Sequence, residues 1–189
     1  MLYKSLHVIV AELNAHLKTR FQLSENKAIL GTILNEEGTV PEENKNKIVC
    51  TLVNLEQDTN IPFNPIYRRQ GDKLLQEQVP LNFNLDVLFT ALFGNYDEAL
   101  KFLSATIYFF QGKSLFDHEN SKGLPPQVPQ LSMEVIKLSY HEAHSLWTAI
   151  GAKYMPSVLF KIRMLSYQEG IAQEVPVITE PEDNVRPNY

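Results

Sequence analysis

Residues 80–112 read PLNFNLDVLFTALFGNYDEALKFLSATIYFFQG, and this stretch decides the fold. In its first half, apolar residues alternate with mostly polar ones, which predicts a strand over Leu81–Phe93 with one face toward a core. The apolar face consists of Leu81, Phe83, Leu85, Val87, Phe89, Ala91 and Phe93. The second half predicts a helix over Tyr96–Gln111, with Asn95 as its N-cap and Gly112 as its stop.

The predicted helix carries apolar residues on more than one side. They are Leu100, Phe102, Leu103, Ile107, Tyr108, Phe109 and Phe110. A helix without a polar face has to be covered on all sides, either by its own domain or by a neighbouring copy. Packing on a sheet within the domain also absorbs such surface, so both explanations stay open. The excess of apolar surface favours assembly over catalysis as the function.

The rest of the chain extends this unit into a single α/β (α+β) domain. A length of 189 residues suits one domain. The patterns predict a mixed sheet of about five to six strands and about three helices, in the order α-β-β-β-α-β-β-α-β. The remaining predicted helices are Leu2–Phe21 and Tyr140–Ala152, the second with a Ser139/Glu142 capping box. The remaining predicted strands are Lys27–Leu34, Lys47–Leu55, Lys113–Phe116, Leu131–Leu138 and Ser157–Tyr167.

Two stretches fall outside this pattern. Glu56–Val79 is predicted to be irregular, and its length suggests a functional arm or an interface loop. Within it, Arg68 and Arg69 are candidates to grip a phosphate or a carboxylate, although a solvated arginine pair explains them equally well. We expect residues 1–168 to form the domain and residues 169–189 to form a proline-rich, acidic C-terminal arm.

Composition and charge exclude several classes of function. The net charge is −5 and the isoelectric point is near 5.5, so no global basic field attracts nucleic acid or anionic lipid. In Leu2–Phe21 the apolar residues are spaced rather than continuous, which predicts an amphipathic helix and no signal peptide or membrane insertion. We therefore expect cytoplasmic synthesis.

The candidate residues for chemistry fit no known motif. Cys50 is the single cysteine, and its place in a strand predicts a buried core residue rather than a nucleophile. Gly112-Lys113-Ser114 resembles the end of a phosphate-binding loop, but Ile107 stands where that motif requires glycine. His141 and His144 are three residues apart rather than the four of the zincin motif, which favours surface or capping roles.

The triplet Asp117-His118-Glu119 contains an acid and a base, but such polar triplets are common in turns. We therefore predict no enzyme activity, no catalytic or metal-binding residue and no cofactor. Trp147 lies among Leu146 and Ile150 on the last predicted helix, and core packing is favoured there over a role as interface anchor.

Two long blocks resemble a known family. One runs from Leu81-Asn82-Phe83-Asn84-Leu85 to Phe109-Phe110-Gln111-Gly112-Lys113. The other is Leu131–Leu165, especially Leu146-Trp147-Thr148-Ala149-Ile150-Gly151 and Tyr154-Met155-Pro156-Ser157-Val158. Both resemble the tail-terminator, or cap, proteins of extracellular contractile injection systems of the antifeeding-prophage type. The similarity extends more loosely to Asn46-Lys47-Ile48-Val49 and the first helix, and covers about residues 1–168.

The resemblance implies a structural role. It implies a homohexameric ring on the end of an inner tube and a sheath, which stops tube growth and anchors the last sheath layer. The partners would be further copies of the chain, the sheath protein and the tube protein, in an assembled particle. An exposed strand edge would accept a strand from the sheath protein. Candidate interface residues are Arg68, Arg69, Phe109, Phe110, Trp147, Tyr154, Lys161, Arg163, Val175, Val177 and Ile178.

The arm is the most specific of these expectations. Its short apolar run Val175, Val177 and Ile178 suits docking, and Pro176 keeps that run extended. We expect the arm to lie on an adjacent subunit or on sheath or tube protein. Two other classes remain: a monomeric cytoplasmic adaptor that binds a peptide at a sheet edge, and a small enzyme that uses Asp117, His118 or His141.

Overall fold

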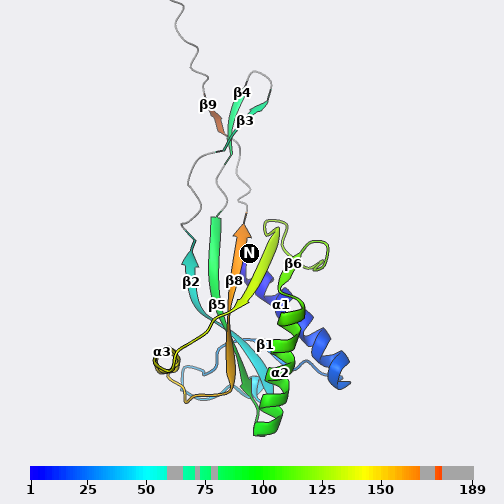
Figure 1. The fold of residues 1–189 in the computed structure, drawn as a ribbon, viewed down its shortest axis with the longest axis vertical. Coiled ribbons are helices and arrows are strands. Elements are labelled where there is room, and N and C mark those ends of the chain that lie inside the picture. Colours follow the sequence, from blue (N-terminus) through cyan, green and yellow to red (C-terminus); the bar gives the residue numbers. More distant parts are fainter. Residues whose placement is uncertain (59–65, 71–72, 78–80, 167–172, 176–189) are drawn as a thin grey trace, which may run out of the picture.

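A computed structural model describes residues 1–58, 66–70, 73–77, 81–166 and 173–175 of the chain (Figure 1). The helices are α1 (Leu2–Phe21), α2 (Tyr96–Gly112) and α3 (Tyr140–Ile150), with a short 3-10 turn at Glu42–Asn44. The strands are β1 (Ala28–Leu30), β2 (Lys47–Gln57), β3 (Ile66–Gln70), β4 (Lys73–Glu77), β5 (Leu81–Leu92), β6 (Leu115–Asp117), β7 (Gln130–Val135), β8 (Ser157–Ser166) and β9 (Gln173–Val175).

Six of these strands form one mixed sheet, in the order β1-β2-β5-β8-β7-β6. Only the β1–β2 pair is parallel, and every other neighbouring pair is antiparallel. The long strand β5 lies inside the sheet, between β2 and β8. The predicted α+β class, with its mixed sheet and three helices, is confirmed.

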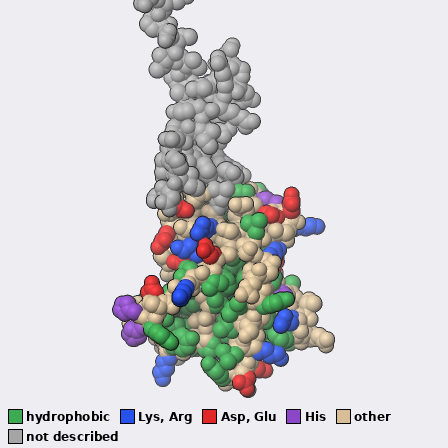
Figure 2. Space-filling model, viewed as in Figure 1, with side chains coloured by type: hydrophobic (Ala, Val, Ile, Leu, Met, Phe, Trp, Pro, Cys, Tyr) green, Lys and Arg blue, Asp and Glu red, His purple; other side chains and the backbone are tan. Residues whose placement is uncertain are grey.

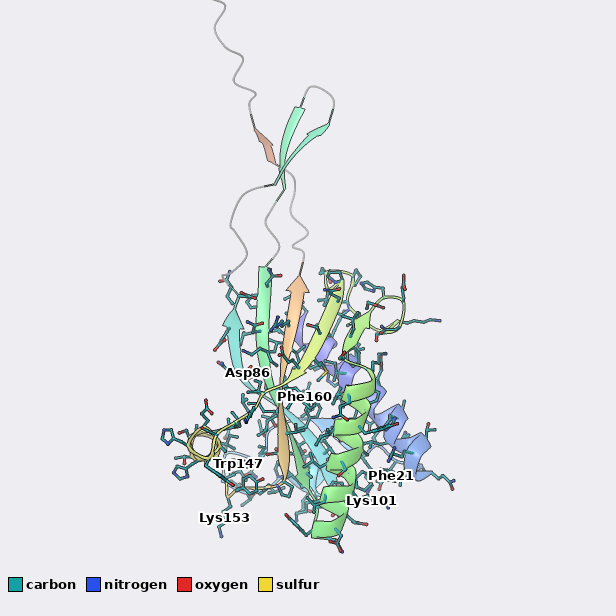
Figure 3. The ribbon with its side chains drawn as sticks, in the orientation of Figure 1. Phe21, Asp86, Lys101, Trp147, Lys153 and Phe160 are labelled. Atoms are coloured by element: carbon teal, nitrogen blue, oxygen red, sulfur yellow. The ribbon has the colours of Figure 1, made fainter. Side chains whose placement is uncertain are left out.

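The alternation along β5 divides the core in two. Leu85, Val87 and Phe89 point toward α1 and α2 and belong to the larger apolar cluster. Leu88 and Leu92 point to the other face, where they pack with Trp147 of α3 in a smaller cluster. Figure 3 shows Phe160 in the middle of the sheet and Trp147 beside α3. The domain is therefore a sheet covered by two helices on one face and by a single short helix on the other.

A buried asparagine fixes α1 to the edge of the sheet. Asn14 donates from Nδ2 to the Ala28 carbonyl at 2.8 Å, and its Oδ1 accepts from the backbone N–H groups of Lys27 and Ala28 at 2.9 and 2.8 Å. Its side chain thus satisfies backbone groups that a short edge strand would leave unpaired. The bounds of α1 agree with the prediction from its apolar stripe.

The domain itself absorbs most of the apolar surface of α2. The side chains of Ala99, Phe102, Leu103, Ala105 and Phe110 are buried, and Ile107 and Phe109 pack partly against the same cluster. Leu100 and Tyr108 remain exposed, at 40% and 60%. Of the two explanations for this helix, packing within the domain accounts for the greater part. The cap at Asn95 is present, since its side chain accepts from the N–H groups of Asp97 and Glu98.

The stretch Glu56–Val79 is not irregular throughout, which corrects the prediction. β2 continues to Gln57, and β3 and β4 pair as an antiparallel hairpin in which Gln70 faces Lys73. In the sequence two residues, Gly71 and Asp72, separate the paired strands. β9 adds to β4, so a small sheet forms in the order β3-β4-β9.

The small sheet lies beyond one end of the large sheet (Figure 1). That end is defined by the register, in which Gln57 of β2 faces Phe83 and Leu81 of β5 faces Ser166 of β8. The first described part of the C-terminal arm, Gln173–Val175, thus pairs with β4 of its own chain.

Several strands end earlier than predicted. The predicted strand Lys27–Leu34 is reduced to Ala28–Leu30, because after Gly31 the chain leaves the ladder and buries Ile33 in the smaller cluster. The predicted strand Leu131–Leu138 ends at Val135. α3 ends at Ile150, because Gly151 adopts a left-handed conformation with φ of 75°. The Ser139/Glu142 capping box at its start is confirmed. No helix in the described ranges is long and apolar enough to cross a membrane.

Candidate functional site

The candidate nucleophile is inaccessible. The Cys50 side chain is fully buried in the larger cluster, and burial raises the pKa of its thiol. A thiolate is the reactive form of cysteine, so this environment disfavours reaction. The structure confirms the prediction that Cys50 is a core residue.

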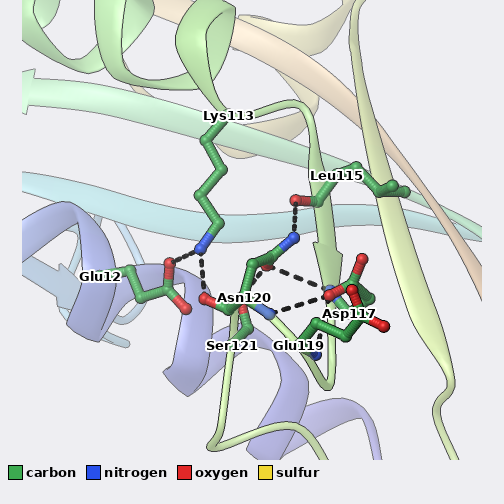
Figure 4. Close-up of polar contacts among 7 residues, drawn as sticks. All are labelled: Glu12, Lys113, Leu115, Asp117, Glu119, Asn120 and Ser121. Carbon is green, nitrogen blue, oxygen red and sulfur yellow. Dashed lines mark hydrogen bonds and ion pairs between the residues drawn. The ribbon is translucent and has the colours of Figure 1, made fainter.

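The Gly112-Lys113-Ser114 and Asp117-His118-Glu119 motifs belong to one structural connection (Figure 4). The Asp117 carboxylate accepts from the backbone N–H groups of Glu119 and Asn120, both at 2.9 Å. Lys113 forms an ion pair with Glu12 of α1 and donates to the Asn120 carbonyl at 2.9 Å. These side chains close a turn after β6 and tie it to α1, which accounts for them without a ligand.

The histidines do not converge on a site. His118, His141 and His144 are all exposed. In the described part of the chain, no group of three His, Cys, Asp or Glu side chains is placed to hold a metal ion.

A concave feature lies beside α3, and we call it the α3 groove. It has a volume of about 940 Å³. Its lining consists of Lys137, Leu138, Ser139, Tyr140, Ala143, His144, Trp147, Thr148, Ala152, Lys153 and Tyr154. The floor is Trp147, which is only 5% exposed, with Tyr154 edge-on at 5.8 Å between ring centroids. Trp147 and Lys153 lie together on this side of the molecule (Figure 3).

The charges of the α3 groove are of one sign. Its lining contains Lys137 and Lys153 but no carboxylate. Neither lysine forms an ion pair with another described residue. The nearby Glu142 is engaged in the capping box, where its carboxylate accepts from the Ser139 N–H, and this hydrogen bond lowers its pKa. The α3 groove therefore combines an apolar floor with unpaired cations.

A second surface is the free edge of β2. β1 pairs only with Ile48–Cys50, so among the described strands Leu52–Gln57 is hydrogen-bonded to β5 alone. Leu52 and Leu55 on this edge are 36% and 45% exposed. A strand edge with free N–H and C=O groups is a template for pairing with another chain. The register shift between Leu52 and Asn54 leaves this edge locally irregular.

A third surface is the polar part of the sheet beyond α3. Asp86 of β5 faces Lys161 of β8 in the register, and Asn84 faces Arg163. Arg163 donates to Glu134 of β7 at 3.0 Å, and both side chains are exposed. Figure 2 shows acidic and basic side chains next to one another in the upper part of the described body, whereas hydrophobic side chains are prominent in its middle and lower parts.

Of the predicted interface residues, Trp147 and Tyr154 come together in the α3 groove, and the others do not form one surface. Phe110 and Trp147 are buried within the domain, and Phe109 packs partly against its core. Tyr154 is 70% exposed, and Lys161 and Arg163 lie on β8. Arg68 and Arg69 lie on β3 and Val175 on β9, whereas Val177 and Ile178 are outside the described residues.

Sequence reasoning missed the α3 groove, and it predicted an exposed strand edge without identifying β2 as the strand. Each depends on which elements become neighbours, and no single stretch of sequence reports that. The available signal for the groove was the pairing of Tyr140 and Tyr154 with Lys137 and Lys153 around one short helix.

Comparison with known proteins identifies one family and several solved structures of similar fold, two of which are described below. Residues 6–180 match the family model described as the Pvc16 N-terminal domain. A PVC sheath/tube terminator in the extended state has a TM-score of 0.57 and 13% identity, over 95% of this chain and 64% of that one. The tube-terminating cap of the anti-feeding prophage has a TM-score of 0.54 and 11% identity, over 89% of this chain and 59% of that one.

The chain thus spans about three fifths of the length of either solved protein. No curated protein matches its sequence significantly. At these identities the structural likeness establishes a shared fold. The family match covers nearly the whole chain, and the chain therefore belongs to the Pvc16 N-terminal domain family.

Proposed function

We propose that this chain is the structural cap of a contractile injection particle. In this role it forms a homohexameric ring at the distal end of tube and sheath, ends tube growth and anchors the last sheath layer. The observation that carries the proposal is the family match over residues 6–180, to which two terminators with the same fold add weight.

The described surfaces support a role in assembly rather than chemistry. The one cysteine is buried, and the acid-base triplet closes a turn. Exposed apolar side chains lie on two sides of the domain, for example Tyr108 on α2 and Tyr154 beside α3. A heterologous contact between different surfaces of successive copies closes into a ring when the rotation allows it. Each contact should bury more than roughly 1,000 Å² in total, the usual minimum for a specific interface.

We assign sheath anchoring to the β2 edge. Main-chain pairing supplies affinity without demanding a particular partner sequence, which suits attachment of an extended sheath segment. A lysine on such an edge opposes strand addition. Leu55→Lys should therefore reduce retention of sheath on purified particles. Leu115→Lys is the matched control, because Leu115 is similarly exposed, at 43%, on the opposite edge strand β6.

The test of the whole proposal is the position of the chain in particles. A tagged chain should label one end of each particle, opposite the baseplate, and particles made without it should carry tubes of uncontrolled length. Labelling at the baseplate end, or a strictly monomeric chain within intact particles, contradicts the proposal.

The free β2 edge also fits a second candidate, a monomeric adaptor that binds an extended peptide. The two candidates differ in mass and in location. An adaptor stays monomeric and is absent from purified particles, whereas a cap is retained in them.

A further inference from the structure

The α3 groove has the character of a receptor for an acidic, extended apolar segment. Its floor is aromatic, its rim carries Lys137 and Lys153, and no carboxylate lines it. We propose that it binds residues 176–189 of a neighbouring copy of this chain. This inference rests on the proposed ring, because the ring places a second copy beside each groove.

The sequence of that segment matches the groove in both respects. It begins Pro176-Val177-Ile178, which supplies an extended apolar run. Glu180, Glu182 and Asp183 follow, against one arginine, Arg186. The apolar side chains would pack over Trp147, and the carboxylates would pair with Lys137 and Lys153. The segment would thus complement both the apolar floor and the charged rim of the groove.

Charge argues against the other helical face of a second copy as the occupant. One exposed apolar side chain on that face is Tyr108, and the Arg20 guanidinium lies 5.1 Å from its ring centroid. Lys101 on the same face is exposed as well. The part of that face around Tyr108 would bring the cations Arg20 and Lys101 to a groove that already carries unpaired cations, and close like charges are unfavourable.

Geometry indicates a neighbouring copy rather than the same chain. The segment follows β9, which lies in the small sheet beyond the end of β8 (Figure 1). The α3 groove includes Lys153 and Tyr154, just before β8 begins at Ser157. β8 has ten residues, so the two regions are separated by about 33 Å. Ile178 is three residues beyond Val175 and reaches only about 11 Å from it. The apolar run therefore falls short of its own groove.

Cysteine cross-linking of the full chain tests this arrangement. The test pair is Ile178→Cys with Thr148→Cys, because Thr148 lines the groove, is exposed and hydrogen-bonds only to the His144 carbonyl of its own helix. The matched control pairs Ile178→Cys with Thr19→Cys. Thr19 is also exposed and bonds in the same way to the Ala15 carbonyl of α1. The native Cys50 is buried and does not compete.

Mild oxidation of assembled particles should give a ladder of covalent dimers and higher species for the Thr148 pair and none for the Thr19 pair. A cross-link confined to single chains, an equal ladder in the control, or no ladder at all overturns the inference. Charge reversal gives an independent readout. Lys137→Glu with Lys153→Glu should cause loss of assembled chain, and adding Glu180→Lys with Glu182→Lys should restore it; absence of restoration contradicts the inference.

The location of the chain separates this inference from the proposed function. If the chain labels the capped end but the Thr148 pair gives no ladder, the cap role stands and the groove assignment fails. If the chain is absent from the capped end, the cap role fails whatever the cross-linking result.

Discussion

Replacement of Trp147 by alanine tests the packing of α3 most directly. The Trp147 side chain is 5% exposed and packs with Ile33, Leu88 and Leu159 between α3 and the sheet. It is the only buried residue of α3, so its removal leaves a cavity beneath the whole helix. We expect Trp147→Ala to lower the free energy of unfolding by about 3–5 kcal/mol. For a domain of this size, such a loss lowers the melting temperature by about 6–20 °C.

The assay is urea unfolding followed by far-UV circular dichroism, because Trp147 is the single tryptophan and the variant loses its fluorescence signal. In the unsubstituted chain, fluorescence reports on α3 packing itself and should give the same midpoint as circular dichroism. Tyr140→Ala is the control. Tyr140 lies on the same helix but is 98% exposed, so its removal should change stability by less than about 0.5 kcal/mol.

Two outcomes would refute this reasoning. If Trp147→Ala and Tyr140→Ala unfold at the same urea concentration, Trp147 does not hold α3 on the sheet. If Trp147→Ala keeps full stability but loses ring formation, the side chain acts as an interface anchor instead.

Three further predictions concern polar and titrating groups. Asn14→Ala should cost about 1–3 kcal/mol in urea unfolding, because it leaves buried backbone groups of β1 unpaired; unchanged stability would contradict the bonding described. The Ser139 N–H lowers the pKa of Glu142 below its ordinary 4.5, so the carboxylate stabilises the fold above that pH and loses its effect as pH falls through the lowered value. The difference in free energy of unfolding between the unsubstituted chain and Glu142→Gln should therefore become smaller in acid. A difference that grows in acid would contradict this prediction. Burial, and to a lesser extent Arg20, lower the pKa of His16 below 6.5 in the folded chain. The neutral imidazole therefore favours folding, and this contribution is lost as the pH falls below 6.5. On acidification the melting temperature of His16→Phe should accordingly fall less than that of the unsubstituted chain.

Local sequence patterns predicted the helices and strands of this fold better than they predicted which of these elements pair or pack together. The alternation of Leu85, Val87 and Phe89 identified the inner strand, and the Ser139/Glu142 pair located the start of α3. Both signals work because pleat periodicity and caps depend on residues close in sequence. Strand ends were less predictable, as at Gly31, because they depend on where a neighbouring strand stops.

The hairpin β3–β4 was missed for a different reason. Its strands are short and its apolar alternation is weak, so the arginines and prolines around it favoured a loop. The position of β8 between β5 and β7 was likewise not encoded in any one segment, and the α3 groove depends on it. The proposed function came mainly from the resemblance of long blocks to a family, because the candidate residues fit none of the short motifs that identify enzymes.

The way the small sheet is attached has a mechanical consequence. β2 and β8 end, and β5 begins, at the end of the large sheet that faces β3, β4 and β9. In an antiparallel ladder the hydrogen bonds lie perpendicular to the strands. A pull on the small sheet is therefore directed along the three strands, and it loads the bonds of the ladders in shear, all at once, instead of opening them one after another. The large sheet therefore resists tension applied at this end better than tension applied across its strands.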